Sequence, residues 1–168
     1  MKIINPDPRK KSPSRICVFC ASSQHIDDSF LGASRKVGQL CAEHDIQLVY
    51  GGGARGAMGF LADGCLNAGG RVIGVIPRFM VDLEWAHQGL HQLVITETMH
   101  ERKARMIENV DAVVALPGGS GTLEELIETL TLKRLGFFLQ PIILVNINGF
   151  YDPLITPVSY THLTLPTN

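Results

Sequence analysis

The feature that most constrains this chain is a regular alternation between short apolar runs and longer segments with helical periodicity. Six runs rich in apolar and β-branched residues predict buried strands, at 16–21, 47–50, 71–76, 93–96, 112–116 and 141–147. Between most of them, apolar residues recur every three or four positions and predict helices, at 30–42, 58–68, 100–109 and 123–135. Because parallel strands need helical crossovers, we expect an α/β fold: a Rossmann-like doubly wound parallel sheet in a three-layer αβα arrangement.

The composition narrows the class of partner. Fifteen Lys and Arg against 16 Asp and Glu give a net charge of −1, so no basic field is available for nucleic acid or an acidic membrane surface. No apolar run approaches the roughly 18 residues of a membrane-spanning helix, and the start of the chain lacks a secretory apolar segment. The four cysteines are too few for a disulfide-stapled module. We therefore expect a cytoplasmic protein with a small-molecule partner.

Ligands of such a sheet bind beyond the carboxyl ends of its strands, so the residues that follow each strand are the first candidates. Ser22 and Ser23 follow the first predicted strand, with hydroxyls for a ligand or for a helix cap. A loop containing Gly52 and Gly53 follows the second, where backbone amides can approach an anion, although a tight turn also favours glycine. This loop is not a dinucleotide fingerprint, because it follows the second strand and no acidic residue lies about 20 positions further on.

The fifth predicted strand runs directly into P-G-G-S-G-T at 117–122, and an amphipathic helix follows at once. Backbone N–H groups and the positive end of the helix dipole meet a glycine loop there, which favours an anion. The candidate phosphate-binding residues are Gly118, Gly119, Ser120, Gly121 and Thr122. No lysine precedes Thr122 as a Walker motif requires, which favours a monophosphate over a triphosphate with magnesium.

Three carboxylates, Glu124, Glu125 and Glu128, come directly after this loop. One interpretation is a capping box, with Thr122 as N-cap and Glu125 at the third helical position. Carboxylates beside a phosphate would repel it unless they faced another group, and the hydroxyls of a sugar are the natural partner. Both interpretations remain open from the residues alone.

Two cations, Arg102 and Lys103, lie at the predicted start of the helix after the fourth strand. The helix dipole disfavours positive charge there, so we interpret Arg102 as a residue that grips a phosphate or ribose oxygen and Lys103 as added charge. The alternative is a solvated face paired with Glu101 and Glu108.

Other polar residues carry weaker signals. Glu84 and Trp85 lie in the long connection after the third strand, which can carry an acid that contacts a base, or the indole can pack beneath the loop. Cys17 and Cys20 lie in one strand and should point to opposite faces, and His87 and His91 flank a glycine rather than a helix turn. We predict no metal site.

Two separated motifs, M-H-E-R-K at 99–103 and P-G-G-S-G-T-L-E-E at 117–125, resemble the LOG family of cytokinin riboside 5'-monophosphate phosphoribohydrolases. These proteins are often labelled lysine decarboxylases. The resemblance runs from about residue 15 to 153 and includes the runs at 20–23, 51–53 and 148–152.

The resemblance implies hydrolysis of the N-glycosidic bond of a nucleoside 5'-monophosphate, AMP among the candidates, to the free base and ribose 5-phosphate. It implies that Arg102 and Glu125 are catalytic. It also implies nucleotide contacts from these positions: Glu84, Lys103, Gly119, Ser120, Gly121, Thr122, Leu123, Glu124 and Thr131. Family members are usually dimers with sites near the interface, so the resemblance implies a homodimer. We expect no cofactor. A nucleotide-binding module without catalysis is the alternative.

A pyridoxal phosphate enzyme would need a sheltered lysine for a Schiff base, and only Lys103 lies near the expected crevice. We assign residues 15–154 to one nucleotide-binding α/β domain and residues 1–14 to a disordered lead-in. Residues 155–168 contain two prolines and no helical stripe, where the family continues with a long helix. We therefore interpret 155–168 as a non-native tail after a truncation, which would expose apolar surface on the last strand.

Overall fold

A computed structural model describes residues 13–83 and 85–159, and a six-stranded sheet forms its centre. The strands are β1 (Arg15–Phe19), β2 (Gln47–Tyr50), β3 (Val72–Pro77), β4 (Gln92–Thr96), β5 (Ala112–Ala115) and β6 (Ile142–Leu144). They lie in the order β4-β3-β2-β1-β5-β6, and every neighbouring pair is parallel. The predicted α/β class with a parallel sheet is confirmed.

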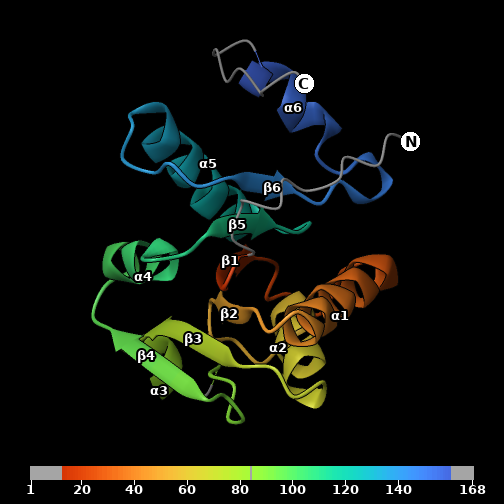
Figure 1. The fold of residues 1–168 in the computed structure, drawn as a ribbon, viewed down its shortest axis with the longest axis vertical. Coiled ribbons are helices and arrows are strands. Elements are labelled where there is room, and N and C mark those ends of the chain that lie inside the picture. Colours follow the sequence, from red (N-terminus) through yellow and green to blue (C-terminus); the bar gives the residue numbers. More distant parts are fainter. Residues whose placement is uncertain (1–12, 84, 160–168) are drawn as a thin grey trace.

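Helices cover both faces of this sheet, as Figure 1 shows. They are α1 (Asp28–Glu43) and α2 (Gly56–Asn67) on one face, and α4 (Met99–Ile107) and α5 (Ser120–Arg134) on the other. Successive strand residues point to opposite faces, so Val18 and Val114 pack toward α1 and α2 while Phe19 and Val113 pack toward α4 and α5. The three-layer, doubly wound arrangement is confirmed.

The strand order reverses at β1. The strands β2, β3 and β4 extend from one side of β1, while β5 and β6 extend from the other. The register pairs Phe19 of β1 with Ala115 of β5, so the loops that follow these two strands begin side by side. In a doubly wound sheet a ligand crevice opens at this point, beyond the carboxyl ends of the strands.

Helices α1 and α2 approach each other closely through glycines. A Cβ on Gly38 of α1 would lie 2.1 Å from the carbonyl oxygen of Leu61, and one on Gly64 of α2 would lie 2.3 Å from that of Arg35. No side chain larger than hydrogen fits at either position without moving a helix backbone. This close packing sets how α2 lies against α1, and the first turn of α2 forms part of one wall of the crevice.

The predicted elements are all present, with ends within three residues of those expected. Three further elements were not predicted: α3 (Arg78–Asp82), the 3₁₀ turn η1 (Ile147–Gly149) and α6 (Asp152–Ser159). We expected no helix after residue 154. This expectation is wrong for residues 155–159, which belong to α6. The first turn of α6 tolerates Pro153, because an amide at that position has no partner within the helix.

The predicted terminal segments are described only in part. Residues 1–12 of the expected lead-in and 160–168 of the expected tail lie outside the described residues. Ser14 belongs to the ordered part, since its backbone N–H donates to the Asp111 carboxylate at 2.7 Å. Among the described helices, none combines the length and the apolar character needed to cross a bilayer.

Candidate functional site

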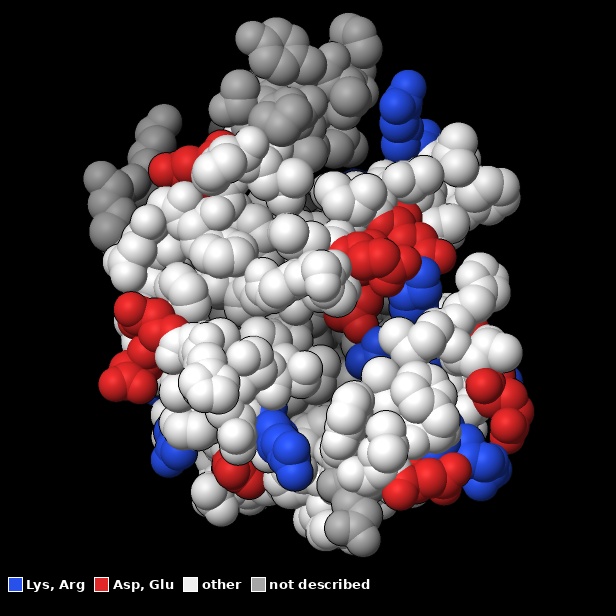
Figure 2. All heavy atoms as spheres, turned by 180° about the vertical axis from the view of Figure 1, so that it is seen from behind, with Lys and Arg blue, Asp and Glu red and all other residues white. Residues whose placement is uncertain are grey.

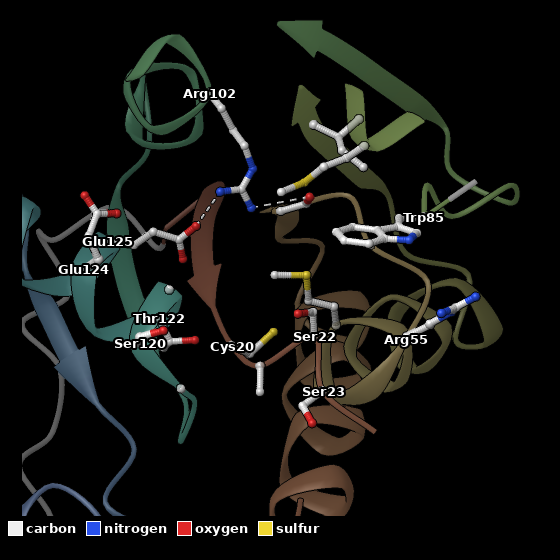
Figure 3. A pocket seen from close by; sticks show the side chains of 18 of the residues that line it. Cys20, Ser22, Ser23, Arg55, Trp85, Arg102, Ser120, Thr122, Glu124 and Glu125 are labelled. Atoms are coloured by element: carbon white, nitrogen blue, oxygen red, sulfur yellow. Dashed lines mark hydrogen bonds and ion pairs between the residues drawn. The ribbon is translucent and has the colours of Figure 1, made fainter. Parts of the chain in front are cut away.

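A cavity of about 400 Å³ opens in the crevice at the carboxyl ends of the strands. Its walls come from the loops after β1, β2 and β5 and from the starts of α2, α4 and α5. Figure 3 shows the labelled polar side chains around it, with Arg102 and Glu125 pointing toward each other and Trp85 on the opposite side. The volume falls within the roughly 300–1,000 Å³ of small-molecule sites.

A buried ion pair forms the wall between α4 and α5. Nη1 of Arg102 donates to Oε1 of Glu125 at 2.6 Å, and the two residues are only 4% and 5% exposed. Nε of Arg102 donates to the Val75 carbonyl at 3.1 Å and Nη2 to the Gly51 carbonyl at 3.5 Å. One guanidinium therefore joins the ends of β2 and β3 to α5 and fixes the orientation of the Glu125 carboxylate.

The environment of Glu125 acts on its charge in two opposing ways. Burial raises the pKa of the Glu125 carboxyl above its ordinary value, because the charged form loses water, while the Arg102 guanidinium pulls the pKa down. The raised pKa means that burial outweighs the ion pair. Glu125 thus takes up a proton at a higher pH than an exposed glutamate does.

The start of α5 is open toward the cavity. Its N-cap residue Gly119 forms no side-chain cap, whereas α4 is capped by Thr98, whose Oγ1 accepts from the Glu101 N–H at 3.0 Å. The capping box considered for Thr122 and Glu125 is therefore wrong, because the helix begins three residues earlier and Glu125 bonds to Arg102 instead. The first amides of α5 remain available for an anion.

Lys103 ties α4 to α5 beside the cavity. Its Nζ contacts the carboxylate of Glu124 and lies 2.6 Å from Oε2 of Glu128. Figure 2 shows red and blue spheres in contact on this face of the molecule, next to a hollow. The hydrogen bonds to Glu124 and Glu128 raise the pKa of Lys103. The sequence suggested sugar hydroxyls as partners of these carboxylates. In the structure, Lys103 pairs with both Glu124 and Glu128.

The opposite half of the cavity is apolar, and sequence reasoning missed most of it. Its lining side chains are Met58, Ile76, Met80, Trp85 and Met99. They come from α2, β3, α3, α4 and the segment after α3. In the sequence, these side chains cannot be told apart from ordinary core residues. The available signal was position, because Ile76, Met80 and Met99 all lie at or just after the ends of strands.

Most of the predicted site residues meet at this cavity. Those that line it are Ser22, Ser23, Gly53, Arg102, Gly119, Ser120, Gly121, Thr122, Glu124 and Glu125. They were chosen from three separate loops and two helices, so their convergence follows from the strand order rather than from their spacing along the chain.

Five predicted positions do not line the cavity. Gly52 and Gly118 support the loops: the Gly52 carbonyl accepts from the His87 N–H at 2.9 Å, and a Cβ on Gly118 would lie 2.2 Å from Oγ1 of Thr122. The others are Lys103, held by its ion pairs, Leu123, packed against the core, and Thr131, exposed and bonded to the Ile127 carbonyl. Glu84 lies outside the described residues.

Neither a pyridoxal Schiff base nor a metal finds suitable residues here. Of the lysines that the structure describes, Lys36 pairs with Glu43, Lys133 bonds to loop carbonyls and Lys103 has a raised pKa, which disfavours the neutral amine. Within residues 13–83 and 85–159, no group of three His, Cys, Asp or Glu side chains is arranged to hold a metal ion. The thiols of Cys17 and Cys20 pack on opposite faces, as predicted.

Comparison with solved structures agrees with the fold. The chain superposes on a molybdenum cofactor binding protein from Rippkaea orientalis with a TM-score of 0.71, at 23% identity over 90% of this chain and 87% of that one. It superposes on the molybdenum cofactor carrier protein from Chlamydomonas reinhardtii with a TM-score of 0.72, at 21% identity over 89% and 86%. At these identities the likeness shows the shared fold alone.

Comparison of sequences is more specific. A family model described as possible lysine decarboxylase matches residues 58–164. The phosphoribohydrolase LOG2 of Arabidopsis thaliana is 41% identical over 84% of this chain and 67% of its own length, and LOG of Oryza sativa subsp. japonica is 41% identical over 88% and 61%. The chain thus spans about two thirds of the length of these curated relatives. Both are named cytokinin riboside 5'-monophosphate phosphoribohydrolases, and this chain belongs to their family, the LOG family.

Proposed function

We propose that this protein hydrolyses the N-glycosidic bond of cytokinin riboside 5'-monophosphates, and of AMP, to release the free base and ribose 5-phosphate. The observation that carries the proposal is the buried pair of Arg102 and Glu125, which faces a cavity whose floor is the open start of α5. The relatives' named activity supports the same chemistry.

Glycosidic cleavage passes through an oxocarbenium-like state with positive charge on the sugar. Glu125 is the carboxylate best placed to stabilise that charge, and it also suits the orientation of a ribose hydroxyl or of the attacking water. Three nitrogens of Arg102 already donate hydrogen bonds to acceptors within the protein. Its main contribution is therefore to hold Glu125 in one orientation and to favour the ionised form, more than to grip the phosphate directly.

The two halves of the cavity suit the two ends of a nucleotide. The amides at 119–122 and the hydroxyls of Ser120 and Thr122 suit a 5'-phosphate, and the methionine-rich half with Trp85 suits a purine base and an apolar substituent on it. Binding energy at both ends then aligns the bond between them with Glu125.

The test is release of free base from AMP and isopentenyladenosine monophosphate. Removing the charge of Glu125 with Glu125→Gln should lower kcat/KM by about 10²- to 10³-fold, the scale of losing one main electrostatic group of a site. The matched control is Glu108→Gln, which removes the same charge from an exposed ion pair with Arg105 outside the cavity and should leave the rate unchanged. A folded Glu125→Gln protein with the wild-type rate contradicts the assignment.

The alternative is a nucleotide-binding module without catalysis. Tight AMP binding by the folded wild-type protein, with no release of adenine or ribose 5-phosphate, would favour that alternative over hydrolysis. Release of carbon dioxide from lysine in the presence of pyridoxal phosphate tests the decarboxylase label, for which the described lysines offer no fitting residue.

A further inference from the structure

The turn that joins β6 to α6 is built around a single buried phenol. Tyr151 is 1% exposed, and its hydroxyl donates to the carbonyl oxygen of Leu116 at 2.7 Å. Leu116 is the last residue before the glycine loop at 117–122 that leads into α5. A residue 35 positions away in the sequence therefore holds the stem of the candidate phosphate loop.

The Leu116 carbonyl lies just beyond the sheet. The Leu116 N–H still donates to the Phe19 carbonyl, and the Val145 N–H donates to the carbonyl of Ala115, the residue before it. No strand residue among those described donates to the carbonyl of Leu116 itself. Since a buried carbonyl needs a donor, Tyr151 supplies what the sheet does not. Burial raises the pKa of the Tyr151 phenol, so its hydroxyl keeps the proton it donates.

The surrounding turn is shaped to present this hydroxyl. The Tyr151 N–H donates to Oδ1 of Asn146 at 2.7 Å, and Nδ2 of the same Asn146 donates to Oδ1 of Asp152 at 2.7 Å. Asn148 and Gly149 both adopt positive φ, at 52° and 72°. Non-glycine residues rarely adopt that conformation, and Asn is among the few that tolerate it. Local hydrogen bonds thus hold the backbone of Tyr151 in one place.

We infer that Tyr151 is a positioning residue for the phosphate end of the substrate, acting through the Leu116 carbonyl on the loop at 117–122. The inference rests on the proposed function for the identity of the ligand. It gives a role to the run at 148–152, which is part of the family resemblance although none of its residues lines the cavity. Loss of the hydroxyl frees the loop stem and weakens binding of the phosphate end selectively.

The chain contains a matched control for this effect. Tyr50 is also fully buried, and its hydroxyl donates to the Gly53 carbonyl at 3.1 Å, in the loop on the other side of the cavity. Tyr50→Phe removes the same group from the same kind of contact, but at the loop that lies across the cavity from α5. The two variants separate positioning of the phosphate loop from general loss of a buried hydrogen bond.

The experiment measures Kd for ribose 5-phosphate and for adenine by calorimetry in three proteins. Tyr151→Phe should raise the Kd for ribose 5-phosphate about five- to tenfold, the equivalent of one hydrogen bond, and leave that for adenine within about twofold. Tyr50→Phe should leave ribose 5-phosphate binding within about twofold of wild type. In turnover of AMP, Tyr151→Phe should raise KM with kcat nearly unchanged, as for loss of uniform binding.

Other outcomes overturn the inference. It fails if folded Tyr151→Phe binds ribose 5-phosphate as wild type does, if both tyrosine variants weaken it equally, or if the wild-type protein does not bind ribose 5-phosphate. Should Tyr151→Phe not fold, the exposed Asn146→Ala should still raise that Kd about two- to threefold, and an unchanged Kd there is also negative. A wild-type protein that binds ribose 5-phosphate but releases no base refutes the proposed function alone, because the binding comparison still decides the role of Tyr151.

Discussion

At the scale of single residues, Arg102 connects three elements of the fold, although it lies in the first turns of a helix. A guanidinium has five N–H donors on three nitrogen atoms, and all three nitrogens donate hydrogen bonds, to Val75, Gly51 and Glu125. The sequence predicted Arg102 as a site residue because a cation there opposes the helix dipole. Its two carbonyl acceptors could not be predicted, since any residue type offers a carbonyl and only the fold decides which ones meet.

Removing the Arg102 charge should move the pH dependence of catalysis. In Arg102→Gln the carboxyl of Glu125 stays buried but loses the group that lowers its pKa, so that pKa should rise further. The acidic limb of kcat/KM against pH then shifts to higher pH, because activity needs the ionised carboxylate. Profiles of base release between acidic and neutral pH measure this shift.

The stability of Arg102→Gln should follow the same titration. A buried carboxyl with a raised pKa favours the folded state when protonated, so its contribution is present in acid and is lost as pH rises through the raised value. The loss of thermal midpoint caused by Arg102→Gln, compared with wild type at the same pH, should therefore be smaller in mild acid than at neutral pH. Arg105→Gln, at an exposed ion pair, is the control and should change neither profile. An acidic limb that stays at the wild-type pH contradicts the electrostatic role of Arg102.

At the scale of secondary-structure elements, Lys103 adds a second set of ion pairs between α4 and α5, beside the one between Arg102 and Glu125. Its partners lie 21 and 25 positions further along the chain, at Glu124 and Glu128. Lys103→Met should leave these two carboxylates facing each other beside the phosphate loop and weaken ribose 5-phosphate binding about three- to tenfold, because like charges and the ligand's charge then repel. The loss should shrink at high salt.

A second change should restore what Lys103→Met loses. Glu128→Gln in the Lys103→Met background removes one of the two unpaired charges, so the double variant should bind ribose 5-phosphate more tightly than the single one. Calorimetry on the two single variants, the double variant and wild type gives the coupling. Strictly additive effects would mean that Lys103 and Glu128 act independently.

The packing of α1 on α2 makes a prediction about stability. Gly38→Ala places a methyl group against the Leu61 carbonyl and should lower the free energy of unfolding by about 1–3 kcal/mol, the range for overpacking. Gly32 lies in the same helix with nothing within 4 Å of a Cβ, so Gly32→Ala should raise it by about 0.5–1 kcal/mol through helix propensity. Urea unfolding compares the two, and equal effects would contradict the close approach.

The elements themselves could be predicted from the sequence, because hydrophobic periodicity is local and the sheet places strand ends together. The start of α5 could not, since Gly119 caps the helix by its backbone conformation and not by a side chain. Met58, Met80 and Met99 could not be assigned to a cavity, because nothing in their local pattern separates them from core residues. The role of Tyr151 could not be predicted for a related reason. The resemblance includes the run at 148–152, but the acceptor of the Tyr151 hydroxyl is Leu116, at the end of a strand 35 positions away.

At the scale of the whole molecule, the most exposed large apolar side chains of the described residues lie between α5 and the edge strand β6. Phe137 and Leu139, in the connection between α5 and β6, are both 78% exposed, and Ile143 of the edge strand β6 is 49% exposed. Exposed apolar residues that lie together mark surfaces that associate. The exposed last strand expected from the sequence is thus present, while the homodimer remains a prediction.

Charging this surface should reduce self-association. Phe137→Lys together with Leu139→Lys should lower the weight-average mass in concentrated solution, because these two side chains make no buried contact that the fold needs. Sedimentation equilibrium over a range of concentrations measures the change. Exchange of two exposed polar residues for lysine, Gln88→Lys with Gln92→Lys, is the control for added charge. A mass unchanged by the apolar substitutions would place any association on another face.

Trp85 gives the protein an internal optical probe. It is the chain's one tryptophan, it lines the cavity at 44% exposure, and its backbone is tied to the glycine loop because the Trp85 carbonyl accepts from the Ala54 N–H at 3.0 Å. A purine that enters the apolar half would displace water from the indole and change its emission. Occupancy of the cavity can therefore be followed in unlabelled protein, on the timescale of mixing, and separately from any chemical turnover.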